Sequence, residues 1–581
     1  MLRRVLILTL LAGLQAAPAQ AARTLLMPGV TYERQVQFTS HGPVALHVVN
    51  APKPGGLWAL RPVLSNGAIV GRERVTAMQR NVSAEATVAG VNGDFFAPAD
   101  GRPSGALMLS SVLAAPPSAD RSSIGVTADG AVRVDRIRFF GTWRGNGQRR
   151  PVLLNRAPGA NGVALFTPSW GPVTPTLNGA LEAVLAPFPA ATPNVDLTGL
   201  VVEHRQGTGG TPIPPGGAVL VARGTGAQRV AAEAPVGTSL TARLLLSPDW
   251  AGVVDAIGGG PVLVRAGKPV FRHFELFSTG QLARNPRTAV AQRADGRVLL
   301  VVVDGRQPGY SVGLTNFEFA QTLVRLGAVA GSGLDGGGSS TMAFDGTLLN
   351  RPSDPGGERA VSEGFFVHYY GVYAAPAAEP VLSPNGDGVA DAQSLAYKLV
   401  RPATVAVNLI GPDKVARELE AGAKTAVGVY RHAWNGLTAE GAPEVEGGWR
   451  FSVTAVDDLG RSSTADRLFS LNRTLGSLSV APSVLRVSPS GGALRAGFTL
   501  ARAAKVTATV ETATGAVITV AGGGSFEAGP ATIVWNARVG RRLVHTGRYV
   551  LRIRAVNEIG RADLTAPFSV RRVAGPPKAR R

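Results

Sequence analysis

The chain of 581 residues contains no cysteine, which excludes disulfide bonds, thiolate chemistry and cysteine-ligated zinc. Acidic residues are scarce: 39 Asp and Glu stand against 59 Lys and Arg, for a formal net charge of +20. A basic protein favours acidic partners, and we expect an anionic cell surface or matrix polymer. Because no nucleic-acid-binding motif accompanies the charge, nucleic acid is not an expected partner.

Long hydrophobic runs are also missing, and none approaches the roughly 20 apolar residues that span a bilayer. The start of the chain has Arg3 and Arg4, an apolar run over residues 5–14, and small residues at Ala19 and Ala21. This layout predicts a signal peptide over residues 1–21, although a retained anchor has the same features. We expect a secreted, periplasmic or envelope-associated protein without a transmembrane segment in the mature chain.

Short apolar runs separated by many of the 73 glycines and 41 prolines indicate strands joined by turns. One segment predicts a helix instead. Thr315 and Glu318 form a capping box, Phe319 and Leu323 recur at helical spacing, and Gly327 stands at the C-terminal cap. The predicted fold of the first part is therefore an α+β domain rich in β-strands, with this helix on a sheet.

The last 200 or so residues contain an internal repeat. HAWNG at residues 432–436 matches IVWNA at 533–537, and GGWRFSVTAVDDLGRSS matches TGRYVLRIRAVNEIGRAD at a similar offset. Alternating strands in both copies predict two all-β immunoglobulin-like sandwich modules. They resemble the module of flagellar hook-capping proteins, which often begins with SPNGDG, as residues 383–388 do. The predicted boundaries are 1–21, 22–373, 374–475, 476–574 and a basic tail at 575–581.

Polar residues gather at two places in the first domain. GVNGDFF, residues 90–96, ends an apolar run. Further on, an apolar strand at 298–303 leads to Asp304 and Arg306, the helix follows, and Leu334 leads into Asp335 and three glycines. This strand, helix and strand place polar residues at strand ends, where α/β layers often hold a site.

Six ordered motifs carry a resemblance to a known family: GVNGDFF, AIGGGPVLVRAGK, RNPRTAV, VVVDGRQPGYSVGLT, LDGGGSSTM and NRPSDPGGERAVSEG. The chain resembles the phosphodiester glycosidase domain over residues 67–373, most weakly between 131 and 250. Gly333 stands where many relatives carry Asn. The resemblance implies hydrolysis of a sugar 1-phosphodiester, often of N-acetylglucosamine, in a phosphate-containing glycan.

The motifs contain residues suited to a phosphodiester. A planar guanidinium binds two phosphate oxygens, so Arg287 and Arg306 are the predicted phosphate ligands, with surface ion pairing as the alternative. A glycine run lets backbone N–H groups approach an anion, and hydroxyl groups follow it. The full predicted binding set is Asn92, Arg287, Thr288, Arg306, Gly336, Gly337, Gly338, Ser339, Ser340 and Thr341.

Glycosyl transfer to water also needs a carboxylate base or nucleophile. The candidates are Asp94, Asp304, Asp335 and Glu358. We expect Asp335 and Asp94 to be the working pair and Asp304 to hold Arg306 or Arg287, whereas turn capping is the alternative for each aspartate. Asn92 is expected either to donate to substrate hydroxyls or to form a turn with the glycine after it.

No cofactor is certain. Clustered Asp side chains leave Ca²⁺ or Mg²⁺ open, whereas zinc is not expected because no HExxH motif occurs. NGDGVAD, residues 385–391, either binds Ca²⁺ or forms a glycine turn, and the turn is the favoured interpretation. A serine nucleophile is not expected, since GxSxG is missing. The expected function is an exported phosphodiester glycosidase. The alternative is a non-catalytic phosphoglycan binder or an envelope adhesion or assembly protein.

Overall fold

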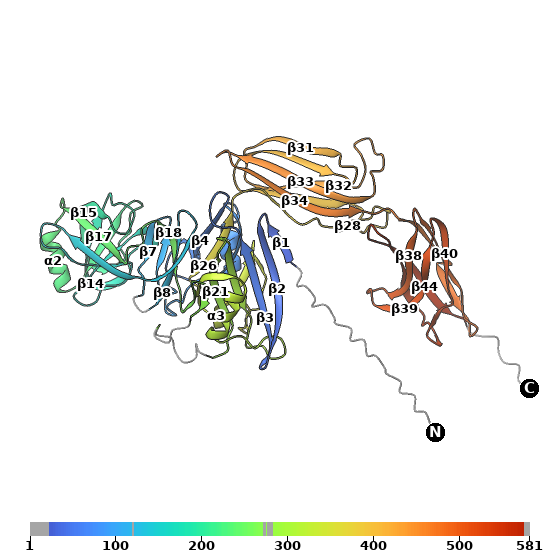
Figure 1. Cartoon of the computed structure of the whole chain (residues 1–581), viewed down its shortest axis with the longest axis horizontal. Helices are drawn as coiled ribbons and strands as arrows, with labels where there is room; N and C mark the ends of the chain where they lie inside the picture. Colours follow the sequence, from blue (N-terminus) through green and yellow to red (C-terminus); the bar gives the residue numbers. More distant parts are fainter. Residues whose placement is uncertain (1–22, 119–120, 271–274, 276–282, 574–581) are drawn as a thin grey trace, which may run out of the picture. The chain divides into compact units, whose positions relative to one another are not determined.

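The computed structural model describes residues 23–118, 121–270, 275 and 283–573 (Figure 1). The predicted signal peptide and basic tail lie outside the described residues. Strands hold 55% and helices 7% of the residues, so the chain is mostly β. It divides into two compact units, Met1–Tyr370 and Gly371–Arg581.

An eight-stranded sheet forms one half of the site region. Its strands, in sheet order, are β1 (Arg23–Met27), β2 (Val30–Thr39), β3 (Gly42–Ala51), β22 (Val298–Val303), β21 (Arg287–Arg293), β23 (Ala328–Gly333), β19 (Val262–Arg265) and β20 (Lys268–Pro269). Both β22 and β23 pair antiparallel with β21, so they run parallel to each other. Their carboxyl ends and the start of β21 therefore share one edge, which brings Asp304, Asp335 and Arg287 to the same end of the sheet.

Helix α3 (Asn316–Arg325) connects β22 to β23 and lies beside β21 in Figure 1. The predicted capping box is confirmed: the Thr315 hydroxyl accepts from the Glu318 N–H (3.2 Å), and the Glu318 carboxylate accepts from the Thr315 N–H (2.9 Å). Phe319 and Leu323 are buried against the sheet, and Gly327 follows the helix at a φ of 90°. The left-handed backbone there explains why glycine ends the helix.

A five-stranded sheet forms the other half. Its strands, in sheet order, are β25 (Thr347–Leu348), β24 (Met342–Phe344), β5 (Thr87–Asn92), β26 (Glu363–Tyr369) and β4 (Trp58–Leu64). Helix α1 (Val75–Asn81) buries Val75 and Met78 in the same core as β5 and β26. The end of β5 lies beside the start of β26, with Asn92 opposite Gly364. The chain passes directly from β23 of the first sheet to β24 of the second, so residues 334–341 join the two.

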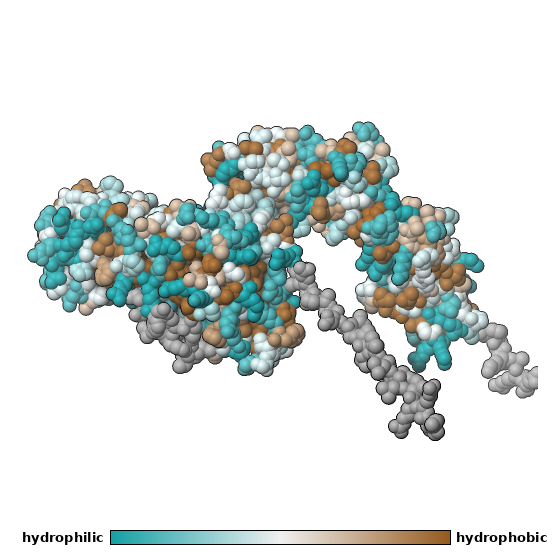
Figure 2. Space-filling view, in the orientation of Figure 1, coloured by the Kyte–Doolittle hydropathy of each residue, from teal (hydrophilic) through white to brown (hydrophobic). Residues whose placement is uncertain are grey.

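Two further sheets complete the first unit. The smaller one contains β7 (Val112–Ala115), β6 (Leu107–Leu109), β18 (Val253–Gly258), β8 (Ser122–Thr127) and β9 (Val132–Arg136). The larger contains β11 (Arg150–Pro151), β10 (Arg138–Arg144), β17 (Ser239–Ser247), β15 (Asp196–Gly209), β14 (Thr176–Leu185), β16 (Ala218–Ala222), β13 (Val163–Phe166) and β12 (Leu153–Leu154). The larger sheet, with helix α2 (Thr225–Glu233), occupies the stretch where the family resemblance is weakest, and its surface is mainly hydrophilic (Figure 2).

The second unit contains two successive pairs of sheets, each pair enclosing its own hydrophobic core. The first pair consists of β27 (Tyr373–Ala374), β29 (Gln393–Leu399) and β32 (Gly428–Trp434), and of β28 (Val381–Leu382), β34 (Ser462–Leu471), β33 (Gly447–Asp457), β30 (Ala403–Ile410) and β31 (Ala416–Lys424). The second consists of β35 (Leu475–Ala481), β37 (Leu494–Leu500) and β40 (Gly529–Trp535), and of β36 (Val484–Val487), β44 (Arg561–Arg572), β43 (Gly547–Val556), β38 (Ala504–Thr512) and β39 (Val517–Phe526). A ribbon of β41 (Arg538–Val539) and β42 (Arg542–Leu543) follows β40.

The sequence repeat falls on corresponding strands of the two pairs. Trp434 ends β32 and donates from its indole to the Leu437 carbonyl (3.1 Å), while Trp535 ends β40 and donates to the Arg538 carbonyl (3.0 Å). In both modules the indole donates to the carbonyl three residues further along the chain, and this bond holds the ring over the core of its own module. The immunoglobulin-like assignment of these modules stays a prediction. Within the described residues, none of the helices is both long and apolar enough to cross a membrane.

We predict that Thr315→Ala lowers the free energy of unfolding by about 1 kcal/mol, because the N-terminal N–H groups of α3 lose their side-chain acceptor. Thr315→Ser, which keeps the hydroxyl, should remain close to wild type. Denaturant unfolding of the three proteins measures the difference. Equal stability of the alanine and serine variants would contradict the capping role.

Candidate functional site

The loops that carry Asp94 and Asp335 converge, as the sequence predicts. The Asp335 N–H donates to the Gly93 carbonyl (3.1 Å), and the Asn92 side-chain amide donates to the Asp335 carbonyl (2.8 Å). The Asn92 oxygen accepts from the Thr288 hydroxyl (2.8 Å) and from the Thr341 N–H (3.1 Å). Asn92 is fully enclosed and its hydrogen-bonding capacity is used within the protein. The expectation that it donates to substrate is therefore corrected: Asn92, with Thr288, joins the loops.

Asp94 is buried and paired with an arginine that the motifs do not contain. Arg121, one residue before β8, donates to both carboxylate oxygens at 2.9 Å. Cβ atoms added at Gly105 and Gly258 would lie 2.4 and 2.1 Å from the Asp94 Oδ2, so these two glycines make room for the carboxylate. Burial raises the pKa of Asp94, and the Arg121 charge opposes the shift.

Asp335 is the more accessible member of the predicted pair, since it is half-buried. Its carboxylate accepts hydrogen bonds from the Ser339 hydroxyl and from the Gly336 N–H. Burial raises the pKa of Asp335 to about 6; the Asp94 charge adds to the shift, while the Ser339 bond and the Arg359 charge oppose it. Asp335 therefore changes charge close to neutral pH.

A third carboxyl group, Glu363, completes the cluster. It begins β26, is fully buried, and accepts from the Asp94 N–H (2.8 Å) and from the Ser362 hydroxyl. Burial raises the pKa of Glu363 to about 8, and the charges of Asp94 and Asp335 add to the shift. At neutral pH, Glu363 is thus mainly protonated beside its two neighbours, since like charges disfavour a further ionisation. A Cβ at Gly93 would lie 2.6 Å from the Glu363 Cγ, which explains the glycine between Asn92 and Asp94.

Two arginine side chains flank the glycine run. A Cβ at Gly337 would lie 3.0 Å from an Arg306 terminal nitrogen, and one at Gly338 would lie 2.1 Å from an Arg359 terminal nitrogen. Arg306 is exposed, and its Nε donates to the Asn285 side chain (2.9 Å). Arg359 is 40% exposed and pairs with Asp354 (2.8 Å).

The glycine N–H groups were predicted to bind the anionic substrate, and two of them have other partners. The Gly336 N–H bonds to the Asp335 carboxylate and the Gly337 N–H to the Pro286 carbonyl (2.9 Å), so both already have partners within the protein. The glycines act by letting guanidinium groups lie close to the backbone. Ser339 donates to the Asp335 carboxylate, and Ser339, Ser340 and Thr341 are all buried.

Arg287 differs from its predicted role as a phosphate ligand. It is only 5% exposed, and its guanidinium donates to the backbone carbonyls of Leu314 (3.0 Å) and Ala283. Burial lowers the pKa of Arg287 to about 10, and the nearby Arg306 charge contributes. Arg287 therefore holds the loops at the sheet edge, while Arg306 is the arginine that remains accessible.

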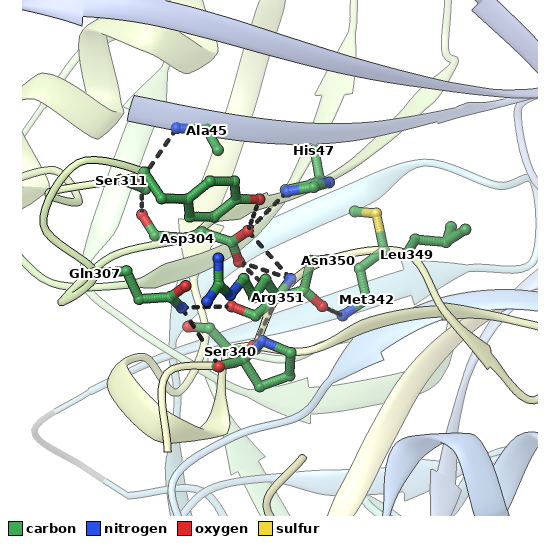
Figure 3. Close-up of polar contacts among 12 residues, drawn as sticks. Ala45, His47, Asp304, Gln307, Ser311, Ser340, Met342, Leu349, Asn350 and Arg351 are labelled. Atoms are coloured by element: carbon green, nitrogen blue, oxygen red, sulfur yellow. Dashed lines mark hydrogen bonds and ion pairs between the residues drawn. The ribbon is translucent and has the colours of Figure 1, made fainter. Parts of the chain in front are cut away.

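Asp304 also has a different role from the one expected. Its buried carboxylate accepts from His47 Nε2, the Tyr310 hydroxyl and the Asn350 side-chain amide, each at 2.9 Å (Figure 3). The Arg351 N–H donates to it as well (3.1 Å). These donors, rather than Arg287 or Arg306, satisfy the charge.

The Asp304 network reaches the glycine and serine loop, because Asn350 also donates to the Ser340 carbonyl (3.1 Å). Asp304 therefore has a structural role, because its hydrogen bonds connect β3 and β22 to the segment that follows the glycine and serine loop. Its position at the end of β22 is as the sequence predicts.

Glu358 is not part of the carboxylate cluster. It accepts from the Thr76 N–H (2.8 Å) and the Thr76 hydroxyl (2.7 Å) at the first turn of α1. A carboxylate there satisfies N-terminal donors and interacts favourably with the helix dipole. The prediction that Glu358 is catalytic is corrected to a helix-capping role, which the sequence hides because the two residues are 282 positions apart.

Among the residues that the structure describes, no group of three or more His, Asp or Glu side chains is arranged to hold a metal ion. In residues 385–391 the Asp391 carboxylate accepts from the N–H groups of Asn385, Gly386 (2.8 Å each) and Gly388 (2.7 Å). These contacts form the glycine turn favoured by the sequence.

Three functional candidates escaped prediction: Arg121, Arg359 and Glu363. Arg359 and Glu363 lie within the motif NRPSDPGGERAVSEG, where Glu363 opens an apolar run, a position that signals a polar group at a strand end. Arg121 lies outside every motif. Only the burial of Asp94 shows that Asp94 requires a cation beside it. The structure thus assembles Asp94, Asp335 and Glu363 with Arg121, Arg306 and Arg359 from segments far apart in sequence.

A cluster of carboxyl groups flanked by accessible guanidinium groups, at the meeting edges of two sheets, suits an enzyme that acts on an anionic substrate. Residues 191–368 match a protein family described as phosphodiester glycosidase. The match includes Arg306, Asp335, Arg359 and Glu363, whereas Asp94 precedes it. It covers the second part of the first unit.

Individual relatives match shorter or more distant stretches. A prophage-derived uncharacterized protein, YomE of Bacillus subtilis, is 34% identical over 119 residues, 20% of this chain and 18% of that protein. The N-acetylglucosamine-1-phosphodiester alpha-N-acetylglucosaminidase of Bos taurus is 40% identical over 68 residues, 12% of each chain. The crystal structure of a hypothetical Synechocystis protein has a TM-score of 0.51 and 27% identity, over 61% of this chain and 64% of that one. The chain therefore spans less than two thirds of each of these relatives.

We predict that Arg121→Met lowers the free energy of unfolding by about 3–5 kcal/mol at neutral pH, because Asp94 keeps a buried charge without its partner. The loss should shrink as the pH falls, since protonation of Asp94 removes that charge. Denaturant unfolding at several pH values measures both effects. Adding Asp94→Asn should restore much of the stability.

A matched control for this variant is Arg205→Met. Arg205 pairs with Glu203, and both side chains are nearly half exposed, at 45% and 46%. An exposed pair contributes little to stability, because solvent screens its charges. If Arg121→Met cost no more than this control at every pH, the buried Asp94 would not depend on its arginine.

Proposed function

We propose that the chain is an exported hydrolase that cleaves the glycosidic bond of sugar 1-phosphodiesters in envelope or extracellular glycopolymers. The family match over residues 191–368 supports this class of activity. The observation that carries the proposal is the convergence of Asp335, with a carboxyl pKa of about 6, and the two arginine side chains beside the following glycines.

In the proposed reaction, the phosphodiester lies against Arg306 and Arg359. Two guanidinium groups can bind its anionic oxygens and neutralise the charge that grows on the leaving phosphate. Water adds to the anomeric carbon, and the bond from that carbon to the phosphate oxygen breaks. The electron pair of that bond stays on the phosphate monoester. Because phosphate leaves more easily than a sugar alkoxide, charge neutralisation can serve where other glycosidases need a proton donor.

Asp335 is the proposed working carboxylate. As a base it accepts a proton from the attacking water, and as a nucleophile it would bond to the anomeric carbon before water replaces it. Both routes require the ionised form. Asp94 and Glu363 are enclosed, so their proposed role is electrostatic: they shape the charge around Asp335 without contacting the sugar.

We expect Asp335→Asn to lower kcat/KM for a synthetic sugar 1-phosphodiester by on the order of 10²–10⁴-fold, the range typical for a positioned proton acceptor. The wild-type rate should fall as the pH drops through about 6, since Asp335 then becomes protonated. Release of free sugar is the measurement. Asp295→Asn, at a half-exposed surface pair with Arg293, is the matched control and should keep wild-type activity.

Two results would contradict the proposal. Full activity of Asp335→Asn would show that Asp335 is not the working carboxylate. Binding of the diester by the wild-type protein without any sugar release would instead support the non-catalytic phosphoglycan binder.

The two arginine residues predicted from the sequence should behave differently. Arg306→Ala should weaken substrate binding about tenfold or more, the scale of a lost charge-assisted hydrogen bond, with little change in stability because the side chain is exposed. Arg287→Ala should mainly destabilise the fold, since the buried guanidinium donates to loop carbonyls. Steady-state kinetics and thermal unfolding of both variants, with Arg306→Lys as the control that keeps the charge, separate the two roles. Equal KM values for Arg306→Ala and wild type would contradict the phosphate role.

A further inference from the structure

A cavity of about 310 Å³ lies on the α3 side of the eight-stranded sheet, away from the carboxylate cluster. Helix α3 packs mainly against β19, β20, β21 and β23, so it leaves the same face of β2 and β3 partly open (Figure 1). The cavity occupies this open part, beside the last residues of the helix. Leu299 near the start of β22 and Arg293 at the end of β21 line it, whereas the cluster lies at the other ends of these strands.

The floor of the cavity follows from the strand register. Thr31 on β2 lies opposite Asn50 on β3, and Asn50 lies opposite Leu299 on β22. Two residues further along β2, Glu33 lies opposite Val48. Because successive side chains of a strand alternate between the two faces, these residues share the face that α3 leaves open. The floor therefore combines apolar and polar side chains.

Three arginine side chains surround this floor. They are Arg23 of β1, Arg293 of β21 and Arg325 of α3. Among the described residues that line the cavity, Glu33 is the only acid, so three positive charges stand against one negative charge. A concave surface that carries charge of one sign concentrates the electrostatic potential and attracts ions of the other sign.

The acidic charge of the floor is already satisfied. One carboxylate oxygen of Glu33 accepts from Arg23 Nε (3.0 Å), and the other accepts from the Gln35 side-chain amide (2.8 Å). The Asn50 side-chain oxygen accepts from Arg297 Nε (2.8 Å), so the N–H groups of the Asn50 amide are the part available to a ligand. The floor thus offers donors beside a neutralised carboxylate.

The other two arginine residues keep much of their hydrogen-bonding capacity. Arg293 Nε lies 3.7 Å from an Asp295 oxygen, which is beyond hydrogen-bond distance. Arg325 donates to the Gln37 side-chain oxygen (2.8 Å), and it forms no ion pair with a carboxylate within the described ranges of the chain. Each guanidinium has five N–H donors, so both can still bind an anion.

A purely structural role explains these arginine residues only in part. A cation near the C-terminus of a helix interacts favourably with the helix dipole, and Arg293 lies close to the end of α3, since a Cβ at Gly327 would be 3.5 Å from its Nε. That role requires neither Arg23 nor a cavity. Two guanidinium groups that line one cavity also repel each other, unless an anion lies between them.

We propose that this cavity is a second anion site, which binds a phosphate, sulfate or carboxylate group between Arg293 and Arg325. We call it the distal anion site. A planar guanidinium can bind two oxygens of such a group. The six residues of β22 separate it from Asp304 and the carboxylate cluster, a distance of roughly 17–20 Å along the strand. The inference goes beyond the proposed function, because a ligand at this distance does not take part in hydrolysis.

Inorganic phosphate is the probe for the distal anion site, and calorimetry of the full chain measures its binding. The background variant is Arg306→Ala, which lacks the accessible arginine of the proposed catalytic site. It should still bind phosphate. Adding Arg293→Gln or Arg325→Gln should weaken this binding about tenfold or more, the scale of a lost charge-assisted hydrogen bond.

Arg205→Gln in the same background is the matched control. It removes an equal charge from a half-exposed pair outside the cavity, so the phosphate affinity should stay unchanged. Thermal unfolding of each variant shows that it is folded. Equal phosphate affinity in all of these proteins, or no phosphate binding by Arg306→Ala, would overturn the distal anion site.

Two substrates then identify the source of the anionic group: a single sugar 1-phosphodiester and a polymer with several such groups. If the group belongs to the polymer, Arg325→Gln should raise KM for the polymer alone, because the second contact is lost. If it belongs to a small free anion, both KM values should stay at the wild-type level. An equal rise for both substrates would contradict a separate site.

Failure of the proposed function would be visible separately, since phosphate binding requires no turnover. If neither substrate were cleaved, the affinity of the wild type and of Arg325→Gln for the intact polymer would replace KM. Loss of phosphate binding in the Arg293 and Arg325 variants would then support the distal anion site while hydrolysis fell. Sugar release with unchanged phosphate affinity in these variants would leave hydrolysis standing and remove the distal anion site.

Discussion

The side-chain amide of Asn92 connects the two halves of the site. It donates to the Asp335 carbonyl and accepts from Thr288 and from the Thr341 N–H, so one buried group bonds to three separate segments. In a low-dielectric interior such a group is costly unless every bond is made. These bonds therefore stabilise the way in which the two sheets meet at this edge, with the Asp94 and Asp335 loops side by side.

Three carboxyl groups held this closely cannot all be ionised at neutral pH. Arg121 supplies a counter-charge to Asp94, and the proton that the cluster retains resides mainly on Glu363, whose pKa burial raises to about 8. Asp335 is left as the half-buried member with a pKa of about 6. The glycines at positions 93, 105 and 258 belong to the same constraint, since a Cβ at any of them would overlap Asp94 or Glu363. The volume that these carboxyl groups need therefore explains the glycine at each of the three positions.

Much of the local structure could be predicted from the sequence because its causes are local. Three features depend on neighbouring residues: the capping box of α3, the strand Val298–Val303 and the repeat that contains Trp434 and Trp535. Asp94 and Asp335 were also expected to work as a pair, because both are carboxylates in motifs of the family that the chain resembles. The roles of individual side chains were harder, because an isolated motif does not show what fills the space around it.

The predicted roles that proved wrong share one physical cause: the side chains concerned have partners that are distant along the chain. Glu358 caps α1 through Thr76, and Asp304 is satisfied by His47 and Asn350. Arg287 has the charge for a phosphate ligand, yet its guanidinium is directed to backbone carbonyls. In each case a distant hydrogen-bond partner decided the role, and which residues become partners depends on the fold, which motif spacing does not reveal.

The distribution of exposure over the site constrains how the proposed reaction can proceed. Glu363 holds a proton but is enclosed, so it cannot deliver that proton to a leaving group. The accessible charges are those of Arg306 and Arg359, which suit a phosphate that departs as an anion. A sugar alkoxide would need an accessible acid, and Asp335, the half-buried carboxyl group of the cluster, is assigned to the attacking water in the proposed reaction. The accessible positive charges therefore support the proposal that the site acts on phosphodiesters.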